Sequence, residues 1–153
     1  LRRRISTPAG YDATLAAIAS LIEAAEAEIA AIATVGIGIP GSENPTTRLI
    51  RGANSTVLNG RPLGADLEAR LHRPVRLSND ANCLALSEFG PGESGFAVIL
   101  GTGVGGGLVI NGRAVEGRNR VAGEWGHNPL PWMSTEEHPG PRCWCGQRGC
   151  IET

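Results

Sequence analysis

The residues with the clearest chemistry lie near the end of the chain, where one histidine precedes three closely spaced cysteines. They are His127, Cys143, Cys145 and Cys150. One imidazole and three thiolates form the donor set of a closed tetrahedral Zn²⁺ site. A disulfide pair or unpaired thiols are the alternatives, but a CxC pair with a third cysteine and a nearby histidine is more specific than any single pair. We therefore predict a structural zinc ion held by these four residues.

Two carboxylates flank the predicted metal ligands. Glu124 precedes His127 by three positions, and Glu152 follows Cys150 by two. A metal held from both sides would fix both carboxylates, whose oxygens accept hydrogen bonds from the paired hydroxyls of a sugar. The alternative is that they only support the metal ligands.

A third candidate is the pair Asn79-Asp80, where a short strand passes into a helix. A carboxylate at a helix N-terminus is favoured in its charged form by the helix dipole. Such a group can accept a proton from a substrate hydroxyl. The alternative is a helix N-cap with no further role.

Two polar loops complete the candidates. The segment Gly101–Gly107 contains five glycines together with Thr102 and Val104 and lies between two strands, so its amides could approach an anion closely. It lacks a following helix, which argues against a dinucleotide site, and the alternative is a flexible hairpin. Asn54 lies in a loop that could face a sugar or form a surface turn.

The elements that must position these residues alternate between helix and strand, which indicates an α/β fold. We expect a helix over 12–32 with Asp12 as N-cap, a strand at 34–39, a helix at 63–71 and a strand at 75–77. A helix from Asp80 to about residue 90 and strands at 96–100 and 107–110 follow, then a type I′ turn at Asn111-Gly112 and mostly loop beyond 117. We expect a domain boundary near residue 74, because Arg73-Pro74 separates a helix from a strand.

Composition excludes several classes of protein. The 153 residues carry a net charge of -1 and 41% hydrophobic residues, so nothing suggests a nucleic-acid or membrane partner. No apolar run approaches the ~18 residues of a membrane span. All the basic residues are arginine, which excludes a Walker-type phosphate loop within this chain because that loop needs its lysine. The cysteine usage suits the reducing cytoplasm, where we expect the protein to act.

Taken together, the segments resemble the ROK family of bacterial sugar kinases and related repressors. The resemblance rests on Gly38-Ile-Pro-Gly41, Asn79-Asp-Ala-Asn82, Gly101–Gly107, Ala122–His127 and Cys143–Glu152, and it spans nearly the whole chain. Within the family, Asn54–Asn59 and Gly123–Trp132 look most like the fructokinase branch, with the N-acetylglucosamine kinase branch next. The fold this implies is actin-like (ribonuclease H-like), with residues 1–74 in a small N-terminal lobe and 75–153 in a larger C-terminal lobe that carries the zinc loop.

The resemblance also implies a role for each candidate residue. Asp80 would be the general base in ATP-dependent phosphorylation of a hexose, fructose first, at a primary hydroxyl. The sugar would be held by Asn54, Asn79, Glu124, His127 and Glu152, and the ATP phosphates would face Gly101, Thr102, Gly103, Gly105 and Gly106. Zinc would be structural, Mg²⁺ would enter with ATP, and the protein would form a homodimer.

The chain departs from the family pattern at both ends. The Asp-Leu-Gly-Gly-Thr-type motif, whose aspartate orients Mg²⁺, does not occur in it, and it ends before the helices that close the adenosine pocket. We therefore expect a fold incomplete at both ends, and no useful kinase activity if these residues are made alone. The alternatives are a sugar-sensing repressor of the same family and a zinc-stabilised binding module without turnover.

Overall fold

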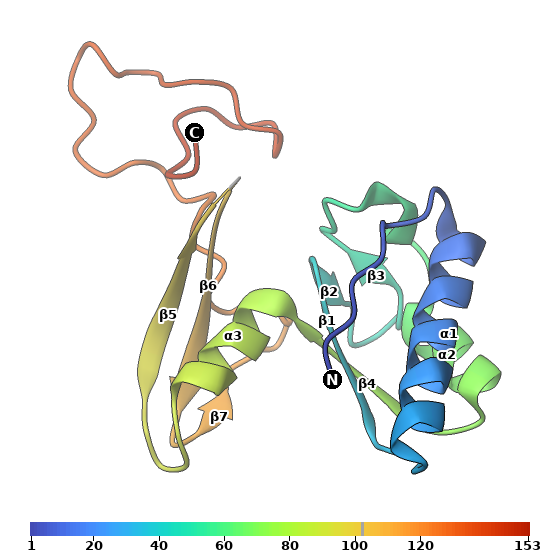
Figure 1. Ribbon diagram of the computed structural model, residues 1–153. Helices are drawn as coiled ribbons and strands as arrows, with labels where there is room; N and C mark the ends of the chain where they lie inside the picture. The colour runs from blue at the N-terminus through green and yellow to red at the C-terminus, as the bar shows by residue number, and fades with distance from the viewer. Residues whose placement is uncertain (102) are drawn as a thin grey trace. The chain divides into compact units, whose positions relative to one another are not determined.

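The computed structural model describes residues 1–101 and 103–153 and divides them into two compact units (Figure 1). Unit 1 is Leu1–Asn79 and unit 2 is Asp80–Thr153. The division falls after the strand β4, Val75–Asn79, and not before it as the sequence suggested. The reason is that β4 pairs along its whole length with a strand of unit 1. The assignment of the units to the two lobes of a kinase remains a prediction.

Unit 1 contains two helices, a short 3₁₀ helix and four strands. In chain order they are α1 Tyr11–Ile29, β1 Val35–Ile39, β2 Ser42–Glu43, β3 Ile50–Arg51, η1 Thr56–Leu58, α2 Leu63–Leu71 and β4 Val75–Asn79. Strand β1 is parallel to β4, whereas β2 and β3 form a small antiparallel pair. The predicted helix and strand types are confirmed, and β2, β3 and η1 are additions that the sequence patterns did not indicate.

The ends of both helices are set by backbone conformation. α1 begins after Gly10, whose φ of 90° makes the turn into the helix, so Asp12 lies in the first turn and its prediction as N-cap is wrong. The helix ends at Ile29, three residues before the predicted end, and Ala30 follows it in the left-handed region. α2 ends in the same way at Leu71, and His72 follows it in the left-handed region.

The core of unit 1 holds the ends of its parallel strands in place. Ile39, Ile50, Leu63, Leu67 and Val75 are buried between the helices and the strands. Burying each such side chain contributes roughly 1.5–3 kcal/mol relative to leaving it in water. Because parallel strands run in the same direction, the chain leaves β1 and β4 at the same edge of the sheet, where Ile39 is paired with Asn79.

Unit 2 begins with α3, Asp80–Glu88, which packs on an antiparallel sheet of β5 Gly95–Leu100, β6 Val104–Ile110 and β7 Arg113–Ala114 (Figure 1). Helix and sheet approach closely because β6 is rich in glycine. A Cβ on Gly107 would lie 2.5 Å from the Ala81 carbonyl oxygen and 2.8 Å from the Ala85 Cβ. Any side chain at position 107 would therefore push α3 away from β6.

The structure confirms one prediction about this sheet and corrects another. The turn at Asn111-Gly112 has both φ angles positive, 52° and 72°, as a type I′ turn requires, so that prediction is confirmed. Strand β6 begins at Val104 and not at 107, so Gly105 and Gly106 lie in the strand. The glycine-rich loop is therefore shorter than predicted.

Residues beyond β7 are mostly irregular, as the sequence indicated. Two isolated β-bridges organise them, Pro129 with Cys150 and Arg142 with Arg148. In Figure 1 this part is the orange-to-red trace that ends at the C-terminus. Within the described part of the chain, every helix is too short or too polar to span a membrane.

Candidate metal centre and active-site residues

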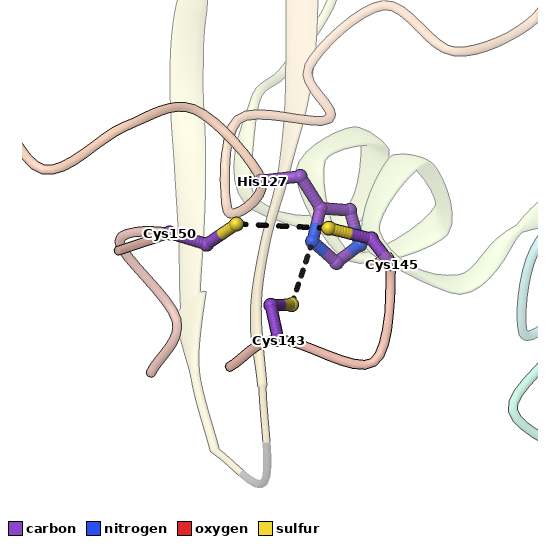
Figure 2. Close-up of side chains that lie close together, drawn as sticks. All are labelled: His127, Cys143, Cys145 and Cys150. Carbon is purple, nitrogen blue, oxygen red and sulfur yellow. Dashed lines mark hydrogen bonds between the residues drawn. The ribbon is translucent and has the colours of Figure 1, made fainter. Parts of the chain in front are cut away.

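The structure brings the four predicted metal ligands together. Each residue offers one donor atom, and these four atoms all lie within 4.8 Å of one another. The residues are His127, Cys143, Cys145 and Cys150. Figure 2 shows the sulfurs of Cys145 and Cys150 facing each other and the Cys143 sulfur below the imidazole. The Cys145 and Cys150 sulfurs are 3.6 Å apart, and the Cys143 sulfur is 3.5 Å from Nδ1 of His127.

These distances fit a tetrahedral zinc ion. With Zn–S of about 2.3 Å and Zn–N of about 2.0–2.1 Å, tetrahedral ligands are separated by about 3.8 Å between sulfurs and about 3.6 Å between sulfur and nitrogen. A disulfide needs about 2.05 Å, and all four cysteines of the chain are free. The cluster is therefore consistent with a structural zinc site, with Nδ1 as the imidazole donor.

The backbone explains why these ligands converge. The amide of Cys143 donates to the Gln147 carbonyl and the amide of Gly146 donates to the Cys143 carbonyl, which closes a tight turn around Cys145. Gly146 supplies the positive φ of 92°. On the other side, the Glu152 amide donates to the Gly126 carbonyl at 3.1 Å, and this holds the segment after Cys150 beside His127.

The three thiols of the cluster differ in the direction in which their pKa values are shifted. Burial raises the pKa of the Cys143 thiol to about 12, and burial also raises the pKa of Cys150. A hydrogen bond from the Gln147 amide lowers the pKa of Cys145. Because a metal binds the thiolate, a cation in this cluster would displace protons from the two buried sulfurs.

Both flanking carboxylates lie close to the cluster. Oε1 of Glu152 accepts a hydrogen bond from the Cys143 thiol at 3.1 Å and lies 3.4 Å from Nδ1 of His127. Much of the surface of Glu124 is exposed to solvent. Its carboxylate is nevertheless partly shielded from water, and this desolvation raises its pKa. His127 lowers that pKa, whereas the negative charges of Asp80 and Glu152 raise it. His127, Asp80 and Glu152 are thus near enough to Glu124 to influence its pKa.

Asp80 is the first residue of α3 and is exposed. Its Oδ1 accepts a hydrogen bond from the Ala81 amide at 2.9 Å, within the first turn of the helix. The positive end of the helix dipole therefore faces a carboxylate that solvent can reach. This placement suits a group that takes a proton, and it also agrees with a helix cap.

The glycine-rich segment lies beside Glu152. A Cβ on Gly103 would be 3.0 Å from Oε2 of Glu152, so the turn between β5 and β6 contacts that carboxylate directly. Gly101 and Gly103 belong to this turn, whereas Gly105 and Gly106 belong to β6. Thr102, the remaining phosphate-binding candidate, lies outside the described residues.

In unit 1, Asn79 and the loop that carries Asn54 both contact the Pro40-Gly41 turn. The Asn79 side-chain amide donates to the Gly41 carbonyl at 3.1 Å. A Cβ on Gly41 would lie 2.7 Å from the Ala53 nitrogen, so the residue before Asn54 packs directly on this glycine. Asn54 itself is exposed, and Asn79 is partly buried.

Asn59 and Trp125 hold candidate segments in place, and the sequence analysis missed both. Asn59 accepts a hydrogen bond from the Ala53 amide and donates one to the Ala53 carbonyl, each at 2.9 Å. Trp125 donates to the Gly105 carbonyl at 3.0 Å. Both residues lie in the stretches that carried the family resemblance, but no spacing rule marks a side chain that bonds to backbone far along the chain.

A cavity of about 490 Å³ lies elsewhere in unit 2. Leu130, Met133, Pro139 and Cys150 are among its lining residues, and none of Asp80, Glu124, His127 and Glu152 lines it. Its walls are the irregular loops around the metal ligands. The cavity is therefore separate from these four candidate residues.

The family model for the ROK family matches residues 1–153. The chain belongs to the ROK family. It is 45% identical over 161 residues to an N-acetyl-D-glucosamine kinase of Pectobacterium atrosepticum, an alignment that covers 99% of this chain and 53% of the relative. The chain thus spans about half the length of the curated relatives it matches.

Two solved structures show the same α/β ROK fold. A ROK hexokinase from Thermus thermophilus is 35% identical with a TM-score of 0.80, covering 97% of this chain and 50% of its own. A ROK family glucokinase from Streptomyces griseus, solved in complex with glucose and AMPPNP, is 32% identical with a TM-score of 0.76, covering 97% and 47%. The fold class is therefore confirmed, and this ROK chain is a partial copy of that fold.

The branch of the ROK family that the sequence motifs favoured is not supported by the relatives. The sequence motifs favoured the fructokinase branch, with N-acetylglucosamine kinases as the alternative. The curated relatives with about 45% identity are N-acetyl-D-glucosamine kinases. These relatives do not support the fructokinase assignment for the ROK chain, and they favour the alternative.

Proposed function

We propose that the protein transfers a phosphoryl group from ATP to a hexose, with N-acetylglucosamine as the preferred acceptor. The observation that carries the proposal is the grouping of candidate residues within unit 2. Oε1 of Glu152 lies 3.4 Å from Nδ1 of His127. The pKa of Glu124, which desolvation raises, responds to His127, Asp80 and Glu152. A proton acceptor at a helix N-terminus beside several hydrogen-bonding groups suits the activation and binding of a sugar hydroxyl. We choose N-acetylglucosamine as the acceptor because the curated relatives are named N-acetyl-D-glucosamine kinases.

In this proposal each residue has a defined task. Asp80 accepts the proton of the attacking hydroxyl, and Glu124, Glu152 and Nε2 of His127 hold the sugar. Asn54 and Asn79 stay sugar-binding candidates from the sequence resemblance alone, and the amides around Gly103 face the phosphates. Phosphoryl transfer depends mainly on positioning and charge stabilisation, so most of these residues act by holding atoms in line.

Zinc and magnesium have separate tasks. Zinc would be held by His127, Cys143, Cys145 and Cys150 and would be structural, because four protein ligands leave no open position for a substrate. With Nδ1 facing the metal, Nε2 of the same ring would be left for the sugar. Mg²⁺ accompanies ATP and neutralises charge on the phosphates. We assign no residue of this chain to it.

The test is a sugar panel with the full-length protein. ADP release is measured with N-acetylglucosamine, fructose, glucose and mannose at equal protein concentration. We expect the highest kcat/KM for N-acetylglucosamine. Fructose is the competing acceptor, because Asn54–Asn59 and Gly123–Trp132 resemble that branch. A higher kcat/KM for fructose would reverse the acceptor, and no ADP release with any hexose would refute the kinase function.

A further inference from the structure

The segment 123–126 lies against the first residues of β6. A Cβ on Gly126 would be 2.1 Å from the Val104 carbonyl oxygen, and one on Gly123 would be 2.6 Å from the Gly106 carbonyl oxygen. Strand β7 pairs only with Val109 and Ile110 of β6. The segment therefore lies beside the part of β6 that β7 does not reach, in a backbone-to-backbone contact that only glycine permits.

The side chain of Trp125 makes a hydrogen bond to the backbone of β6 within this contact. Its Nε1–H donates to the Gly105 carbonyl at 3.0 Å. Its ring meets Phe96 edge to face, with centroids 6.2 Å apart and planes at 71°. The same Phe96 ring fills the space above Gly106, where a Cβ would lie 2.5 Å from its Cζ. The indole is thus both packed against Phe96 and hydrogen-bonded to Gly105.

Glycines at 105, 106 and 107 give this part of β6 no side chains of its own to fix its position. A glycine backbone has more conformational freedom than that of any other residue. A hydrogen bond from a packed, rigid ring to the Gly105 carbonyl limits how far the strand can shift. At the turn before it, Gly103 already abuts Glu152.

We infer that Trp125 is a positioning residue that sets the distance between the sugar-contacting residues Glu124 and His127 and the phosphate-facing backbone at Gly103–Gly106. Trp125 lies between Glu124 and His127 in the sequence, so a shift of its indole moves both. The inference rests on the proposed kinase function, because that function assigns the two segments to sugar and phosphate. In-line transfer is sensitive to misplacements of about 1 Å, and such a shift lowers kcat more than it lowers the affinity for either substrate.

The experiment compares two matched substitutions in the full-length protein. Trp125→Phe keeps an aromatic ring beside Phe96 and removes the N–H donor. Trp132→Phe makes the same change at a side chain that is 97% exposed. We expect kcat to fall about three- to ten-fold for Trp125→Phe, the effect of losing one hydrogen bond. Both KM values should stay within about two-fold, zinc content should be unchanged, and Trp132→Phe should behave as wild type.

A second variant removes the donor without altering the shape of the ring. 3-Benzothienylalanine at position 125 replaces the indole N–H by sulfur, and it decides the question if Trp125→Phe folds poorly. The same fall in kcat supports the inference. A lower melting temperature with unchanged kcat per zinc-loaded protein would show a merely structural role and overturn it.

The failure of the inference can be told from the failure of the proposed function. Wild-type protein that phosphorylates a hexose, with unchanged kcat in both donor-free variants, would overturn the positioning role alone. Wild-type protein that phosphorylates no hexose would refute the kinase function and the positioning role with it.

Discussion

Oε1 of Glu152 lies 3.4 Å from Nδ1 of His127, the ring nitrogen that also faces the Cys143 sulfur. Glu152 follows the ligand Cys150 by two residues, and its side chain is only 9% exposed. One short segment therefore carries a metal ligand and a carboxylate that we assign to the sugar. Any change that frees Cys150 from the cluster should also free Glu152.

The first prediction follows for Cys150→Ser. Wild-type protein should contain close to one zinc per chain, and the variant should lose most of it, because serine is a poor ligand for Zn²⁺ and a structural site needs all four donors. Sugar binding should weaken as well. Metal analysis and calorimetric titration with the sugar measure the two effects.

Cys83→Ser is the matched control for this prediction. Cys83 lies in α3 and is not among the clustered residues, so its replacement should leave the zinc content unchanged. Wild-type protein without zinc, or with a disulfide between Cys143 and Cys150, would contradict the assignment of the site.

The metal cluster was predictable because its information is local. Cys143, Cys145 and Cys150 lie within eight residues, so their spacing is visible in the sequence, whereas His127 is held beside them by the Glu152–Gly126 hydrogen bond. Helix α2 was predicted with its observed bounds, because Pro74 limits it and apolar residues recur at helical spacing. Patterns of this kind depend on neighbours in the chain, and the sequence displays those neighbours directly.

The contacts that were missed depend on segments far apart in the chain. Strand β6 begins at Val104 because Leu100 pairs with it, and a run of glycines gives no alternation that would reveal this. Trp125 bonds to Gly105, twenty residues earlier. Asp12 was taken for an N-cap because of its residue type, whereas Gly10 makes the turn through its positive φ. Such features follow from tertiary structure and leave no spacing rule.

The second prediction concerns pH and the pair Glu26–Arg73. Oε1 of Glu26 accepts hydrogen bonds from Arg73 at 2.7 Å and from the Ala33 amide at 2.9 Å, and these bonds lower its pKa. Because the folded pKa lies below the unfolded one, this group's contribution to stability is fully present above the ordinary glutamate pKa. It is lost as the pH falls through the folded pKa.

Urea denaturation between about pH 3 and pH 7 measures this effect, since the ordinary glutamate pKa of about 4.3 lies within that range. Glu26→Gln should lower the free energy of unfolding at neutral pH and flatten its decline with acid. Glu23→Gln, at an exposed position of the same helix, should leave the decline as in wild type. An equal decline in all three proteins would show that the Glu26 contacts contribute nothing.

The third prediction concerns Asp80 as the general base of the proposed kinase. General base catalysis is typically worth ~10²–10⁴-fold, so Asp80→Asn should lower kcat by about that factor while sugar affinity changes little. Asp12→Asn is the matched control, because Asp12 also lies in the first turn of a helix. Near-normal turnover by the Asp80 variant would move the proton acceptor to another residue.

The last prediction concerns Asn59, which holds Ala53 through both its backbone amide and its carbonyl. Ala53 packs on Gly41 and precedes Asn54, so Asn59→Ala should loosen the loop that we assign to the sugar. Two lost hydrogen bonds of about 0.5–1.5 kcal/mol each predict a loss of about 1–3 kcal/mol in the free energy of unfolding. The KM for the sugar should rise, while kcat should change less because Asp80 is untouched.

Asn44→Ala separates a local effect on the sugar loop from a general loss of stability. The Asn44 side chain also accepts two backbone hydrogen bonds, from Thr46 and Thr47, but in a different loop. It should lower the free energy of unfolding by a similar amount and leave the sugar KM unchanged. If both variants raise the KM equally, the effect reflects stability alone, and Asn59 has no particular link to Asn54. If only Asn59→Ala raises it, the two hydrogen bonds at Ala53 hold the sugar loop in its binding conformation.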